Sequence, residues 1–169
     1  MTETRRVCVR GLIKHNGALF AQRLKNHQGE NDFWCTPGGG VDSLENLHDA
    51  LRREMIEETG VTPEIGRLVL VQQFSDGIPH RHGYVEQLEF FFEITNPQDY
   101  FSINLTDTTH GEVEIAEYGF IDPQTTNILP TILQTPAFKE VLVNPATQVL
   151  FHTDLPSSAT VVTTKNTSI

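Results

Sequence analysis

The sequence has little positive charge and no long hydrophobic run. Its 169 residues include 12 Lys and Arg against 22 Asp and Glu, which gives a formal net charge of −10. An acidic chain without a basic stripe is a poor partner for nucleic acid or for anionic membranes. No stretch approaches the roughly 18 apolar residues of a membrane-spanning helix. The composition therefore argues against both partners, and an anionic substrate would need local cations.

Cysteine is also scarce. The only two, Cys8 and Cys35, lie in apolar, strand-like surroundings, so we expect buried free thiols rather than a disulfide or a metal pair. The first six residues lead directly into a strand-like run at 7–9 and not into the apolar core of a signal peptide. These features predict a cytoplasmic protein.

The length fits one domain, which we place at residues 1–150, followed by a tail at 151–169 that is flexible or packs on the domain. The strands that we expect cover residues 7–13, 18–23, 33–36, 68–74, 87–94 and 114–121. A helix should follow a cap at Ser43 or Asn46 and end at Gly60. A second, interrupted helix is expected at 129–143 and a long polar loop at 96–111. The pattern predicts an α+β fold, and the apolar strand at 88–94 would suit a homodimer edge.

The first of these helices carries a distinctive set of acids. Glu54, Glu57 and Glu58 are spaced i, i+3 and i+4, so they share one helix face with the apolar side chains of the preceding turns. Burying these charges unpaired would cost several kcal/mol or more. Arg53 projects about 100° away from Glu54, so we expect that it cannot offset the repulsion alone. The pattern predicts a bound divalent cation, with Mg²⁺ or Mn²⁺ favoured by oxygen ligands. A solvated acidic helix is the alternative, but these acids lie on the apolar side.

The segment 39–61 resembles the Nudix box, the signature of the Nudix hydrolases. The matching positions are Gly39, Glu45, Arg53, Glu54, Met55, Glu57, Glu58, Gly60 and Val61, at the spacing of that signature. The preceding run 34–39 is similar to the family's entry to the box. One departure is Leu44, where many members have Gly, and it removes no side chain that performs chemistry.

The resemblance implies an α/β/α sandwich with a mixed sheet between helices. It also implies Mg²⁺-dependent cleavage of the pyrophosphate in a nucleoside diphosphate linked to another group, with Mn²⁺ as a substitute. The implied metal ligands are the carbonyl of Gly38 and the carboxylates of Glu54, Glu57 and Glu58. Arg53 resembles the family arginine that pairs with an acidic residue of the box, for which we choose Glu45.

The box leaves the general base open, because members of the family differ at this point. The candidates are Glu54, Glu57 and three later glutamates, Glu112, Glu114 and Glu117. The later ones are equally well explained as a solvated acidic loop. The candidate substrate contacts are Arg23 at a strand end, Gly39 in the turn and Arg81 in a histidine-flanked loop, and exposed cations are the alternative for both arginines.

Two other functions compete with hydrolysis. A Nudix-fold regulator that binds a nucleotide without cleaving it is the main alternative, although such proteins usually have a degraded box. An enzyme acting on capped RNA fits poorly with an acidic chain. The marker residues of known substrate subgroups do not fit here, so the sequence does not specify which small nucleotide derivative is the substrate.

Overall fold

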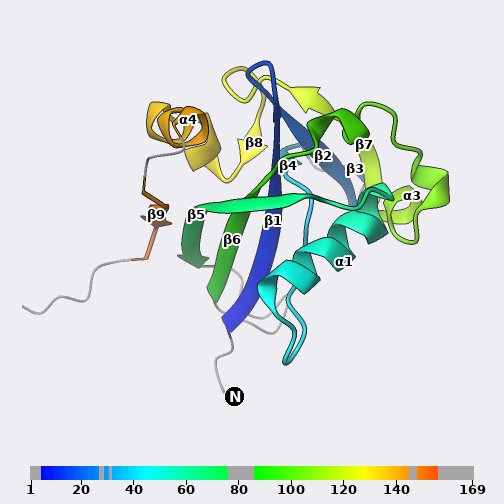
Figure 1. Cartoon of the computed structure of the whole chain (residues 1–169), viewed down its shortest axis with the longest axis horizontal. Helices are drawn as coiled ribbons and strands as arrows, with labels where there is room; N and C mark the ends of the chain where they lie inside the picture. Colours follow the sequence, from blue (N-terminus) through cyan, green and yellow to red (C-terminus); the bar gives the residue numbers. More distant parts are fainter. Residues whose placement is uncertain (1–4, 27–28, 31, 76–85, 145–147, 156–169) are drawn as a thin grey trace, which may run out of the picture.

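The computed structural model describes residues 5–26, 29–30, 32–75, 86–144 and 148–155 (Figure 1). These residues form nine strands: β1 (Arg5–His15), β2 (Ala18–Asn26), β3 (Gly29–Glu30), β4 (Trp34–Cys35), β5 (Ile65–Ser75), β6 (Glu86–Ile94), β7 (Ile115–Ile121), β8 (Ile128–Leu129) and β9 (Leu150–Thr153). The main path of the sheet is β8-β4-β2-β1-β6-β5-β9, and β3 and β7 also pair with β2. Parallel pairs (β1–β6, β5–β9 and β4–β8) mix with antiparallel ones, which confirms the predicted mixed sheet and α+β class.

Two helices cover the sheet from opposite sides (Figure 1). Helix α1 (Leu47–Thr59) packs Ala50, Leu51 and Met55 into one apolar core. Helix α4 (Pro136–Val143) packs Phe138 and Val141 into the other. The helices thus complete the sandwich that the resemblance implied. No helix in the described part of the chain is long and apolar enough to cross a membrane.

Strands β1 and β2 diverge and leave room for the start of the box. Their register pairs join only residues 14–15 to 18–19, next to the tight turn at Asn16-Gly17. Beyond that end, the segment 37–41 runs beside β1. Val9 N–H donates to the Gly39 carbonyl at 2.9 Å, and Val41 N–H donates to the Val7 carbonyl at 3.0 Å. The glycine turn is therefore held by backbone hydrogen bonds to a core strand.

Helix α1 begins and ends where the sequence indicates. Of the two candidate caps, Asn46 is used, and its side-chain oxygen accepts from Asp49 N–H at 2.9 Å. At the other end Gly60 has φ +73° and donates its N–H to the Ile56 carbonyl. Both caps satisfy backbone groups that the helix cannot pair internally.

Leu44, the departure from the box, lies in the left-handed region with φ +67° and is fully exposed. A leucine gains no packing there and pays the steric penalty of that conformation. We expect Leu44→Gly to raise the free energy of unfolding by about 1 kcal/mol, which urea denaturation would measure. A loss of stability in this variant would contradict the strain argument.

One predicted segment is right in part and another is wrong. The interrupted helix expected at 129–143 does break at Pro136, and α4 follows the break, but the part before it is the end of β8 and a 3-10 turn (η3, Thr131–Gln134) rather than α-helix. Residues 96–111 are not a polar loop. They contain two 3-10 turns, η1 (Pro97–Tyr100) and η2 (Leu105–Asp107), and they bury Tyr100 and Ile103 against the α1 core.

The homodimer edge that we expected at residues 88–94 is also wrong, because β6 is hydrogen-bonded to β1 on one side and to β5 on the other. Dimerisation itself stays a prediction. Strand β9 carries the sheet beyond residue 150, and most of the predicted tail, from 156 onward, lies outside the described residues. Cys8 and Cys35 are free thiols, as predicted, and burial raises the pKa of both, that of Cys35 to about 11.

Candidate active site

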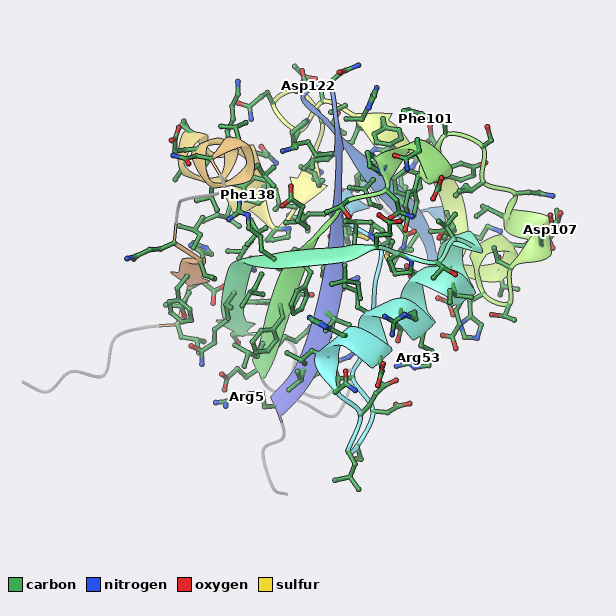
Figure 2. All side chains as sticks on the ribbon, viewed as in Figure 1. Arg5, Arg53, Phe101, Asp107, Asp122 and Phe138 are labelled. Carbon is green, nitrogen blue, oxygen red and sulfur yellow. The ribbon has the colours of Figure 1, made fainter. Side chains whose placement is uncertain are left out.

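Arg53 projects from α1 (Figure 2) and is the centre of an ion-pair network. Its Nε and Nη2 donate to the two carboxylate oxygens of Glu45, each at 2.9 Å. Its Nη1 donates to Glu54 at 2.9 Å and to Glu57 at 3.4 Å, while Nη2 also donates to the Gly40 carbonyl at 2.9 Å. Arg53 reaches Glu54 and Glu57 although it projects in a different direction from the helix axis, because its long side chain extends along the helix surface. The expectation that Arg53 alone cannot offset the repulsion among the three acids stays a prediction.

This network keeps Arg53 and Glu45 charged. The hydrogen bond from Arg53 lowers the pKa of the half-buried Glu45 to about 2. The same hydrogen bond raises the pKa of Arg53 above its ordinary value, although partial burial opposes this. Glu45 is therefore a permanent anion at neutral pH and a fixed anchor for Arg53.

Glu58 points into the protein rather than into solvent. The residue is 5% exposed, and its Oε2 accepts a hydrogen bond from Gly38 N–H at 2.8 Å. Burial raises the pKa of this carboxyl to about 7, and the Gly38 hydrogen bond limits the rise. A cation beside this group would stabilise its charged form.

Glu54 lies against the same turn. A Cβ placed on Gly39 would be 2.5 Å from the Glu54 carboxyl carbon, so only glycine allows this approach. The side chains of Glu54 and Glu57 are 16% and 27% exposed. Glu54 and Glu58 thus face the glycine turn, and Glu57 shares the guanidinium of Arg53 with Glu54.

These oxygens fit a hard divalent cation by their chemistry. Within the described residues, no three His, Cys, Asp or Glu side chains are already grouped to hold a metal, and Arg53 contacts both Glu54 and Glu57. Mg²⁺ does not require such a cage, because it commonly binds one or two carboxylates, waters and substrate phosphates. The donor set around the turn is therefore compatible with magnesium.

Arg10 is a site residue that our sequence analysis missed. Its Nη1 donates to the Gly38 carbonyl at 2.7 Å, and its Nε donates to Glu89 at 3.1 Å. Burial works against the charge of this guanidinium, but Glu89 and other anions raise its pKa overall. The one signal in the sequence that could have identified Arg10 is its positive charge within the otherwise apolar residues 7–13 of its strand. Arg10 fixes the Gly38 carbonyl, which keeps a second lone pair for another partner.

A cavity of about 580 Å³ opens beside this turn on the face opposite α1. Its walls come from β1, β5, β6 and β9, and from the segment 33–36 that precedes the turn. Arg10, Thr36 and Glu89 line it, and Arg10 contacts the turn directly. The cavity and the carboxylates therefore lie on either side of the glycine turn.

The other predicted residues are placed as follows. Arg23 pairs with Glu117 at 2.6 Å, and its guanidinium lies 5.9 Å from the centre of the Trp34 ring. Glu112 and Glu114 are exposed on the one-turn helix α3 (Gly111–Glu114), which contacts α1. His110, just before α3, has its Nδ1 at 3.4 Å from Glu57 Oε2. Arg81 lies outside the described residues.

Comparison with known proteins agrees with this geometry. A model of the NUDIX domain matches residues 3–142. An 8-oxo-dGTP diphosphatase from Proteus vulgaris is 39% identical over 70 residues, or 41% of this chain and 59% of that protein. An ADP-ribose pyrophosphatase from Methanocaldococcus jannaschii is 31% identical over 88 residues, or 52% and 50% of the two chains. The chain therefore belongs to the NUDIX domain family.

A solved structure gives the same assignment of fold. The MutT protein from Methanosarcina mazei Go1 superimposes with a TM-score of 0.58 at 20% identity, covering 87% of this chain and 99% of that one. The chain matches only about half to three fifths of the length of the two enzymes above, and they act on different substrates by name. Family and fold follow from these matches, whereas substrate does not.

Proposed function

We propose that this protein is a Mg²⁺-dependent Nudix pyrophosphohydrolase that cleaves a small nucleoside diphosphate derivative, with Mn²⁺ as a substitute metal. The observation that carries the proposal is the packing of the α1 carboxylates against a glycine turn that borders a cavity. Glu54, Glu57, Glu58 and the Gly38 carbonyl would hold the metal. When bound, the metal neutralises phosphate charge and activates a water molecule for attack.

Neighbouring residues of the protein hold these carboxylates in position. Arg53 and its anchor Glu45 hold the Glu54 and Glu57 carboxylates on one side of the turn. The Gly38 N–H fixes one oxygen of Glu58. Preset ligands of this kind lower the cost of organising a charged transition state.

For the general base we keep Glu54, Glu57, Glu112, Glu114 and Glu117 as candidates. The contacts between α1 and α3, the helix that carries Glu112 and Glu114, support keeping these two. For the substrate phosphates, Gly39 and Arg23 stay candidates, and so does Arg81. We also keep the domain at 1–150, a cytoplasmic location and a homodimer as predictions.

Metal removal tests the proposal. The purified protein should release phosphate or a nucleoside monophosphate from at least one member of a panel of nucleoside triphosphates, ADP-ribose, sugar nucleotides, dinucleoside polyphosphates and NADH. We expect EDTA to abolish turnover and Mg²⁺ or Mn²⁺ to restore it, because the metal carries several kcal/mol of charge stabilisation. Mass spectrometry would identify the leaving group.

Turnover that persists in EDTA would contradict the proposal. Tight nucleotide binding without turnover of any panel member would instead favour the non-hydrolytic regulator. The intact Arg53–Glu45 pair and the intact box weigh against that alternative.

A further inference from the structure

A row of polar side chains crosses the floor of the 580 Å³ cavity. Gln72 on β5 stands opposite Glu89 on β6 and opposite His152 on β9 in the strand registers. Glu89 in turn accepts a hydrogen bond from Arg10 on β1. All four side chains line the cavity. A polar row in the middle of a sheet is costly unless each member is satisfied.

Two residues that line this cavity each carry a buried polar atom without a partner in the part of the chain that the structure describes. Gln72 is 6% exposed and Thr36 is 1% exposed. Neither Gln72 Oε1 nor Thr36 Oγ1 has a hydrogen-bond partner among the residues that the structure describes. Buried polar atoms in native proteins are nearly always bonded, so both atoms need a water or a bound ligand as partner.

The charges of the cavity set the direction in which a ligand would enter. Glu89 is paired with Arg10, so the inner wall has no surplus positive charge for a phosphate. Phe74 and Phe91 also line the cavity, on opposite sides of the Gln72–Glu89 pair along the strands, and either suits a planar apolar ring. Arg6 also lines the cavity and lies beside the glycine turn, with its guanidinium 3.3 Å from where a Cβ on Gly40 would stand. The neutral end of a nucleotide therefore belongs inside, and its phosphates belong at the turn.

We propose that Gln72, assisted by Thr36, selects the substrate by hydrogen-bonding the edge of a neutral nucleobase in this cavity. This inference rests on the proposed function for the phosphate end of the substrate. A side-chain amide presents one acceptor and two donors, so it bonds two adjacent groups on a base edge at once. The Thr36 hydroxyl donates or accepts and adds a third bond. A sugar phosphate without a base leaves all of these groups unpaired.

Binding of nucleoside monophosphates tests this step separately from catalysis, because they contain no pyrophosphate bond. Calorimetry in Mg²⁺ buffer would compare AMP, GMP, CMP and UMP with ribose 5-phosphate. We expect at least one nucleotide to bind tenfold or more tightly than ribose 5-phosphate. Gln72→Leu should lower the affinity for that nucleotide by about tenfold or more, since one bidentate contact accounts for a change of this size. The affinity for ribose 5-phosphate should stay within about twofold of the wild type.

The matched control is Gln73→Leu, the next residue on β5, whose side chain contacts Glu86 and does not line the cavity. It should bind the nucleotide as the wild type does. Thr36→Val replaces one hydroxyl with a methyl group and is expected to weaken nucleotide binding about threefold or more. This variant tests the inference if Gln72→Leu does not fold. Unchanged affinity in a folded Gln72→Leu or Thr36→Val variant would overturn the inference. So would wild-type protein that binds no nucleotide more tightly than ribose 5-phosphate.

The two proposals fail in different ways. Hydrolysis of a pyrophosphate without any preference for a base would contradict the role of Gln72 and leave the proposed function intact. Selective binding of one monophosphate with no turnover on the panel would support the base-reading cavity and contradict hydrolysis.

Discussion

Replacing Glu57 or Glu58 with Gln is expected to lower kcat by roughly a thousandfold while the protein stays folded. Each change removes one negative charge but keeps the size of the side chain. The metal contributes several kcal/mol of transition-state stabilisation, and a loss of about 4 kcal/mol corresponds to about three powers of ten in rate. Rates at saturating Mg²⁺, on the substrate that the panel identifies, would measure the effect.

The Glu58→Gln amide can still accept the Gly38 N–H hydrogen bond through its oxygen, so a loss of rate would report charge rather than folding. Glu140→Gln on α4 is the matched control, because this exposed glutamate belongs to the opposite face of the sheet. It should retain wild-type rates. Full activity in both Glu57→Gln and Glu58→Gln would remove the basis for a metal site on α1.

The parts of the site that the sequence predicts are those set by local geometry. The acids share one helical turn, and the caps at Asn46 and Gly60 lie at the two ends of the same helix. Helical periodicity and capping chemistry therefore place the carboxylates without knowledge of the rest of the fold. Local reasoning did not predict the contacts of Arg53 with Glu54 and Glu57, because an angle around the helix axis does not describe how far a long flexible side chain extends.

The cavity could not be predicted from the sequence, for a different reason. Arg10 and Glu89 meet because β1 and β6 pair in parallel, although the two residues are 79 positions apart in the sequence. Gln72 faces them only through the register of β5 against β6. Registers between distant strands depend on the whole core and not on local patterns. A polar residue inside an apolar strand was the available clue, but it does not identify its partner.

Gly38→Ala is expected to destabilise the protein strongly. Gly38 has φ +128°, a conformation that other residues rarely adopt, and a Cβ would stand 2.2 Å from the Val9 carbonyl oxygen. That oxygen belongs to the backbone of a core strand, so the turn must move instead. We expect a loss of about 4 kcal/mol in the free energy of unfolding, from backbone strain and from broken hydrogen bonds such as Gly38 N–H to Glu58.

Urea denaturation of Gly38→Ala beside Gly119→Ala would measure this loss. Gly119 is the matched control, since a Cβ there meets nothing within 4 Å and its change should stay below about 1 kcal/mol. The turn also carries the backbone groups that hold Glu58 and Arg53. Activity per folded Gly38→Ala molecule should therefore fall as well. A variant as stable and as active as the wild type would show that the turn does not organise the carboxylates.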